Sequence, residues 1–224
     1  TVTTASDDIP LGVQGLQVDV SAGRSAPLNL TVIHLVINEQ DADQPSTDSA
    51  EFVEIATGVP FVTVSDYVLV LWNGSTDVSY LAFDIQATAD ANGLILAGSV
   101  NVLPAPAILL TNALGGATDI IQNGQDAVAI FQGPASAFPN NSSLTANGLI
   151  DALVYDTGDA DDPALLGVLL GAGPEAVQVD EWGSLGSTVG TLNSIQRCAG
   201  SARRDGRAWS ALTPPSPGLP NLCP

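Results

Sequence analysis

The chain has 224 residues, of which 24 are acidic and only five are basic, so its formal net charge at pH 7 is −19. All five basic residues are arginines, and so strongly negative a chain is excluded as a default binder of nucleic-acid backbones and is disfavoured at anionic membranes. Hydrophobic residues make up 45% of the chain, enough for a core, whereas 22 glycines, 15 prolines and an excess of Asp over Glu argue against a helical bundle.

Residues 1–30 are predicted to form an N-terminal arm ahead of one domain that covers residues 31–224. The arm is polar and rich in turn-forming residues, except where Leu16, Val18 and Val20 alternate with polar residues. Such alternation is typical of a strand with one buried face. The arm is therefore expected to carry one extra strand.

Strand candidates then follow at short intervals. The run from Leu30 to Asn38 is dense in β-branched residues, which is typical of a strand buried on both faces. Later candidates are bounded by turn residues, including Asn-Gly pairs at 73–74, 92–93, 123–124 and 147–148 that favour tight hairpins. This spacing predicts an all-β fold, an antiparallel β-sandwich. The later candidates are Glu51–Ala56, Tyr67–Trp72, Ser79–Ile85, Leu94–Val100, Ala107–Leu110, Ala127–Gln132 and Ile150–Tyr155.

One short helix and an extended tail complete the expected elements. Asp162 is a suitable N-cap, Pro163 suits the first helical position, and Gly171 would end the helix after an apolar run. The stretch from Thr213 to Pro224 contains five prolines and is expected to wrap the surface in extended form.

Several short motifs follow one another in an order that is specific to one family. They read Val-Ile-Asn-Glu at 36–39, Glu-Phe-Val-Glu at 51–54, Tyr-Val-Leu-Val-Leu-Trp-Asn-Gly at 67–74, Ile-Gln-Asn-Gly-Gln-Asp-Ala-Val-Ala at 121–129, Asp-Ala-Leu-Val-Tyr at 151–155, Ser-Ile-Gln-Arg-Cys at 194–198 and Pro-Ser-Pro-Gly-Leu-Pro-Asn at 215–221. This order resembles the lamin tail domain, in the type found in secreted bacterial and invertebrate proteins. The resemblance implies an immunoglobulin-like β-sandwich without catalytic activity, which binds or scaffolds and often stands beside secreted nucleases or other hydrolases.

Three features of the sequence predict a secreted protein. The two cysteines, Cys198 and Cys223, would close a C-terminal loop as a disulfide, which persists only in oxidising compartments. The chain starts at Thr1 without an initiator Met, as a processed protein would. The third feature is the set of sequons for N-glycosylation, at Asn29, Asn73, Asn140 and Asn141. Separately, no apolar run approaches the ~20 residues of a membrane span.

The first candidate metal site is an acidic cluster within residues 39–54. Aspartates at alternate positions in a turn rich in Pro and Ser supply the hard oxygen ligands that calcium prefers, although the spacing is not that of an EF-hand. Uncompensated carboxylates held together need a cation, so we predict calcium here; the alternative is a solvated turn that joins two strands. The predicted ligands are Asp41, Asp43, Asp48 and Glu51.

The second candidate calcium site is formed by Asp159, Asp161 and Asp162, near Asp156. Its alternative explanation is structural, because Asp162 would cap the predicted helix and its neighbours would lie at the positive end of that helix. Asp180 and Glu181 would complete this cluster if the chain folds back on itself.

Catalytic interpretations find little support. Asp156-Thr157-Gly158 matches the triplet of aspartic proteases, but that chemistry needs two carboxylates that share a proton, and the chain carries a single such triplet. His34 is the only histidine, and it lies between Ile33 and Leu35 in a predicted strand, where a packed side chain is expected. One His and two paired cysteines do not supply an ordinary zinc site.

We therefore expect a non-catalytic, secreted structural or adhesive module, stabilised by calcium. It would associate with itself when the strand of the arm adds to the open sheet edge of a neighbouring copy. The other expected partners are extracellular matrix or cell-surface components. A cluster of arginines near the C-terminus would either pair with local carboxylates such as Asp205 or dock onto the acidic face of another copy. The alternatives are an accessory binding domain of a secreted hydrolase or nuclease, and a carbohydrate-binding module that uses Trp72, Trp182 and Trp209.

Overall fold

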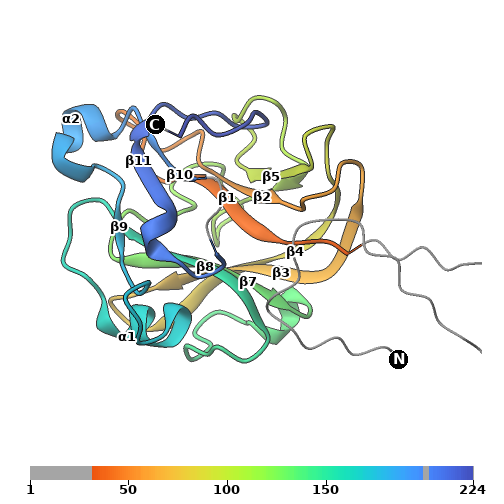
Figure 1. Ribbon diagram of the computed structural model, residues 1–224, viewed down its shortest axis with the longest axis horizontal. Coiled ribbons are helices and arrows are strands. Elements are labelled where there is room, and N and C mark those ends of the chain that lie inside the picture. Colours follow the sequence, from red (N-terminus) through yellow and green to blue (C-terminus); the bar gives the residue numbers. More distant parts are fainter. Residues whose placement is uncertain (1–31, 199–201, 224) are drawn as a thin grey trace, which may run out of the picture.

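The computed structural model describes residues 32–198 and 202–223, which fold into two β-sheets packed face to face (Figure 1). The predicted arm, residues 1–30, and the sequon at Asn29 lie outside the described residues. Sheet A has the order β11-β10-β1-β2-β5-β6 and sheet B the order β4-β3-β7-β8-β9. Strand pairs are antiparallel except β5–β6 and β8–β9. The prediction of an immunoglobulin-like all-β sandwich is confirmed.

Sheet A contains β1 (Val36–Asp41), β2 (Phe52–Ala56), β5 (Leu94–Gly98), β6 (Ile108–Leu109), β10 (Ser194–Arg197) and β11 (Trp209–Thr213). Sheet B contains β3 (Thr63–Asn73), β4 (Val78–Thr88), β7 (Asp126–Gln132), β8 (Leu149–Asp156) and β9 (Val179–Asp180). The short helical segments are η1 (Ala135–Ala137), α1 (Pro163–Leu165), η2 (Leu166–Leu170), η3 (Gly183–Leu185), α2 (Ser187–Gly190) and η4 (Gly206–Ala208).

Sheet B is buried on both faces, because its central strands alternate two sets of apolar residues. Leu69 and Leu71 of β3 point into the core between the sheets, where they meet Ile37 and Ile55 of sheet A. The alternate residues along the strands of sheet B point away from this core and are covered by the α1–η2 segment and by Phe138. The outward set includes Val68, Val70, Trp72, Ala129, Phe131 and Val154, packed against Leu165, Leu169 and Leu170.

The strands agree with the sequence prediction from β2 to β8, with shifted ends. The run 30–38 is different, since residues 32–35 carry no strand and β1 begins at Val36 and continues to Asp41. The pairing Asp41↔Phe52 keeps this acidic segment in the ladder with β2, so Glu39 and Asp41 lie in a strand and not in the predicted turn. Of the Asn-Gly pairs, 73–74 forms the short turn between the paired strands β3 and β4, and 147–148 ends the long connection between the paired strands β7 and β8. The pair at 92–93 connects β4 to β5 of the other sheet.

The predicted helix is also present. The Asp162 carboxylate accepts hydrogen bonds from the backbone N–H groups of Ala164 and Leu165, both at 2.8 Å, and Pro163 occupies the first turn. The helix continues as the π-helical η2 and ends at Gly171, whose φ of 97° favours glycine. None of the helices in the described parts of the chain has the length and apolarity needed to cross a membrane.

Candidate functional site

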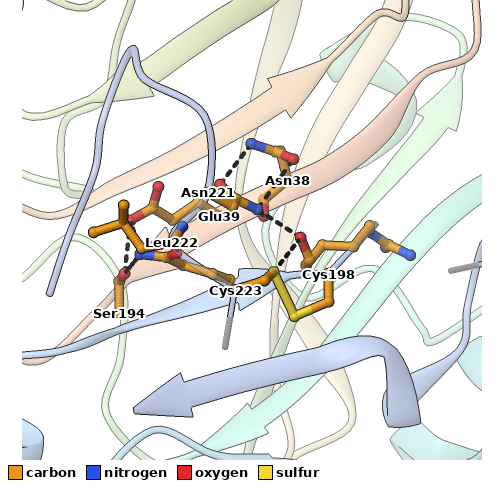
Figure 2. The surroundings of a disulfide bond; sticks show 9 residues. Asn38, Glu39, Ser194, Cys198, Asn221, Leu222 and Cys223 are labelled. Carbon is orange, nitrogen blue, oxygen red and sulfur yellow. Dashed lines mark hydrogen bonds between the residues drawn. A yellow bond between two sulfur atoms is a disulfide. The ribbon is translucent and has the colours of Figure 1, made fainter. Parts of the chain in front are cut away.

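The outer face of sheet A is crossed by an extended C-terminal segment, residues 214–223, which we name the C-terminal strap (Figure 2). Gln196 of β10 binds the strap at two points: its Nε2 donates to the carbonyl oxygen of Pro214 at 2.8 Å, and its Oε1 accepts from the N–H of Leu222 at 2.6 Å. The predicted extended tail is therefore a fixed layer of the fold.

Two glutamates hold the centre of the strap. Glu39 of β1 and Glu54 of β2 are directly opposite one another in the sheet, and both are fully buried. The backbone N–H and the hydroxyl of Ser216 donate to the Glu39 carboxylate at 2.7 and 2.8 Å, while the N–H of Gly218 donates to Glu54 at 2.6 Å. From the sheet, Ser194 donates to Glu39 at 2.6 Å and Asn38 donates to Glu54 at 2.7 Å.

The end of the strap is fixed by Asn221 and by the predicted disulfide. The Asn221 amide donates to the carbonyl oxygens of Arg197 at 2.7 Å and of Asn38 at 2.9 Å, and accepts from the Asn38 amide at 3.0 Å. Cys198 and Cys223 are joined with their Cα atoms 5.5 Å apart, closing a loop with a sequence separation of 25 (Figure 2). Residues of the first, second and last family-like motifs thus contact one another.

Burial changes the ionisation of the glutamate pair. Loss of solvent raises the pKa of Glu54 to about 7, and the charge of Glu39 adds to the rise. The pKa of Glu39 is raised by burial as well, although its hydrogen bonds with Ser194 and Ser216 lower it. Two facing carboxyl groups with no cation between them favour protonation of one partner. The strap therefore rests on a pair that takes up a proton near neutral pH.

A buried ion pair connects sheet A to sheet B below the strap. An Arg197 nitrogen lies 2.6 Å from a carboxylate oxygen of Asp151, and both side chains are almost fully buried. The guanidinium also donates to the carbonyl oxygen of Ile37 at 2.6 Å and lies 4.3 Å from the ring centroid of Trp209. Asp151 additionally accepts from the N–H groups of Ile37 at 2.8 Å and Arg204 at 2.7 Å. Of the clustered arginines, Arg197 pairs with Asp151 and Arg207 pairs with Asp205, at 2.9 Å.

The predicted ligands of the first calcium site point in different directions. Glu51 accepts from the N–H groups of Ile120 and Ile121, at 2.9 and 2.6 Å, and burial raises its pKa to about 7. Asp43 and Asp48 are brought together by the Asn123 amide, which donates to them at 3.3 and 2.8 Å.

Asp41 lies instead beside Glu181, which the sequence alone places with the second cluster. Burial raises the pKa of both groups well above the usual range; the charge of Asp41 raises the pKa of Glu181 further, and the charge of Glu39 raises that of Asp41. One oxygen of Glu181 accepts from the N–H of Ala42 at 3.0 Å, whereas the second oxygen is buried without a hydrogen-bond partner among the described residues. No clue in the sequence links residue 181 to residue 41, because this contact depends on how the segment after β9 returns to sheet A.

Within residues 32–198 and 202–223, no three acidic, His or Cys side chains are arranged as a group that would hold a metal ion. The carboxylates of the first cluster instead accept hydrogen bonds from N–H and amide donors, and burial raises the pKa of Asp41, Asp43 and Glu51. Calcium binding therefore stays a prediction.

The second cluster is divided between two roles. Asp162 is the helix N-cap, which agrees with the structural alternative, while Asp159 and Asp161 are exposed. Asp156, the first residue of the protease-like triplet, accepts from the N–H of Gly158 at 2.7 Å and from the Gln178 amide. This carboxylate therefore stabilises the turn after β8.

His34 precedes β1 and is half-buried, so the prediction that it lies in a strand is wrong. Burial lowers its pKa, and the charge of Arg203 lowers it further, which keeps the imidazole neutral at pH 7.

Of the tryptophans, Trp72 is fully buried and Trp182 donates to Asp43 at 2.5 Å.

The sequons at Asn140 and Asn141 are exposed, whereas the half-buried Asn73 donates to the Gln122 side chain at 2.5 Å.

A depression of about 330 Å³ lies on sheet B, away from the strap. Its lining residues are Ser65, Asp66, Tyr67, Asp84, Ile85, Gln86, Gly133 and Pro134.

Comparisons of the chain with known protein families, with curated proteins and with solved structures found no match. The resemblance to the lamin tail domain consequently rests on the motifs in the sequence.

Proposed function

We propose that this chain is a non-catalytic structural module of the lamin tail type that acts outside the cell. The observation that carries the proposal is the convergence of three separated motifs on the C-terminal strap. The most conspicuous polar residues of these motifs, Glu39, Glu54 and Asn221, bind backbone groups and neighbouring polar side chains. Side chains used in this way hold layers together, which is the task of a scaffold.

The proposed module is stabilised by calcium and assembles with other copies of itself. Support for a cation comes from Glu181, which is buried beside Asp41, whose negative charge raises the pKa of Glu181, and which has one oxygen without a hydrogen-bond partner among the described residues. Binding of a divalent ion to the native state alone would stabilise it. Support for assembly comes from β4, a long strand at the edge of sheet B.

The test is to measure the melting temperature and the particle size of the full chain at pH 7.5, first with calcium and then with a chelator. We expect particles larger than a monomer, and a higher melting temperature with calcium that Glu181→Gln removes. Asp66→Asn, which removes the same charge from an exposed carboxylate outside both predicted calcium sites, is the control. A melting temperature indifferent to chelation would contradict the metal, and a chain that is monomeric under both conditions would contradict assembly.

A further inference from the structure

Among the described residues, the strand at one edge of sheet B is open along most of its length. This strand, β4, spans 11 residues, pairs with β3 alone among the described strands, and is longer than β6, β9 and β11, the other described edge strands. Its first part is covered, because the N–H of Ser79 donates to Ser142 at 3.0 Å and the N–H of Asn141 donates to Ser79 at 2.7 Å. Beyond that point, residues 80–88 make no described backbone hydrogen bond outside the ladder with β3.

The open part of β4 has few of the features that normally protect an edge. It contains neither Lys nor Pro, its ladder with β3 is irregular between Ser79 and Leu81, and its single charge is Asp84, whose carboxylate accepts a hydrogen bond from the N–H of Ala135 at 2.6 Å. Leu81, Phe83 and Ala87 face the core between the sheets but are only half-buried, while Asp84, Gln86 and Thr88 are exposed. An added strand with an apolar and a polar face would complete the burial of the first row.

We infer that the open edge of β4 accepts residues 16–20 of a second copy of this chain, so that copies join by strand addition. This inference rests on the proposed function and names its contact surface. The segment reads Leu-Gln-Val-Asp-Val and has the required alternation.

Charge selects the direction of the added strand. In a parallel arrangement with Val18 opposite Phe83, Asp19 would lie opposite Asp84, and like charges placed directly opposite are destabilising. The antiparallel arrangement keeps Val18 opposite Phe83 but places Gln17 opposite Asp84 and Asp19 opposite Ala82. Leu16 and Val20 then lie opposite Ile85 and Leu81, so both apolar rows match.

The place where the described chain begins favours a second copy as the donor. The N–H of His34 donates to Thr57 and the N–H of Thr57 donates to Gly93, so the chain enters the sandwich beside the turn that follows β4. On its own β4, the antiparallel segment would end opposite Leu81, at the far end of the open edge. Residues 21–31 would then have to return along the whole edge, a reversal that a neighbouring copy does not require.

The first readout is the size of the full chain by sedimentation velocity, for Val18→Lys and for Gln17→Lys. Both variants add the same charge in the arm, but only Val18→Lys places it in the apolar row. We expect association roughly tenfold or more weaker for Val18→Lys, corresponding to about 1.4 kcal/mol, and unchanged or stronger for Gln17→Lys.

The second readout is a disulfide between copies. Chains with Gln17→Cys are mixed under mild oxidation with isotopically labelled chains with Asp84→Cys, and Asp19→Cys replaces Gln17→Cys as the control for the parallel arrangement. A mixed-label cross-link for Gln17→Cys alone supports the inference. In a variant that carries both Gln17→Cys and Asp84→Cys, a cross-link confined to one chain assigns the arm to its own edge and overturns the inference.

The outcomes separate the two proposals. If the chain assembles but is indifferent to Val18→Lys and gives no cross-link, β4 is not the acceptor and the structural function stands. If the unaltered chain is monomeric throughout, both are contradicted.

Discussion

Arg197 shows how much one residue can contribute when it is surrounded by acceptors. Its guanidinium binds Asp151 and the carbonyl oxygens of Ile37 and Ala202, so it satisfies groups from both sheets. Removing one partner of a buried ion pair leaves the other charge uncompensated, at a cost of about 3–5 kcal/mol. We therefore expect Arg197→Met to lower the free energy of unfolding by about that amount in urea titrations.

Arg207 provides the matched control, because its pair with Asp205 is partly exposed, with 55% of the Arg207 side chain accessible. Exposed ion pairs contribute little to stability because solvent screens them, so Arg207→Met is expected to change the free energy of unfolding little. Equal losses for the two variants would show that Arg197 acts through general charge and not through its buried contacts.

The contacts of individual side chains were the part of the structure least predictable from the sequence. The helix N-cap Asp162 was predicted, because capping is local. The partners of Glu39, Glu54 and Asp151 lie far along the chain, at separations of 177, 164 and 46 residues. An acidic residue inside an apolar strand indicates that a partner exists, but it does not identify the partner.

The C-terminal strap is neither helix nor strand, and removing its disulfide tests whether such a segment can still be a structural layer of the fold. Replacing both cysteines, Cys198→Ser with Cys223→Ser, opens the loop that the disulfide closes. We expect a loss of about 2–4 kcal/mol of unfolding free energy, from the greater freedom of the unfolded chain. The hydrogen bonds of Glu39 and Glu54 are expected to keep residues 214–218 in place.

Hydrogen exchange of the Ser216 and Gly218 N–H groups distinguishes the two anchors. Continued protection of these amides in the double Ser variant supports anchoring by the glutamates. Exchange at the rate of an unfolded segment would mean that the disulfide alone holds the strap.

The strands were predictable to the extent that their own residues carry the signal. β2, β3, β4, β7 and β8 have dense β-branched or alternating patterns, and their existence was predicted from those patterns. β9 has only two residues, and β10 with β11 carries Ser, Gln and Arg at positions that are covered by other segments. The strand predicted at 30–38 starts only at Val36, because local β propensity does not determine where strand pairing starts.

For the whole molecule, the buried carboxyl groups predict a distinctive dependence of stability on pH. The pKa of Glu54 is about 7 in the folded chain, above its ordinary value of 4.5, and that of Asp126 is raised by burial to about 6. The folded chain therefore binds these protons more tightly than the unfolded chain. The resulting stability is fully present below pH 4.5 and is lost as the pH rises through 7.

We expect the melting temperature to fall between pH 5 and pH 8, and Glu54→Gln to make this decline shallower by an amount on the order of 1–3 kcal/mol in unfolding free energy. Asp161→Asn, at an exposed position, should leave the slope unchanged. A melting temperature that rises over this range would show that the carboxyl groups are ionised at little cost in the folded protein.

The order of strands in sheet A has a consequence for biosynthesis. β1 pairs with β10, so Glu39 meets Gln196 across a separation of 157 residues. While the chain emerges from the ribosome, β1 has β2 on one side and an unfilled position on the other until residues 194–197 have been made. Contacts between such distant segments fold slowly, because a long loop must close before they form. The nascent protein is therefore expected to need protection of its early strands, and a chain truncated before residue 194 to be a substrate for chaperones and proteases.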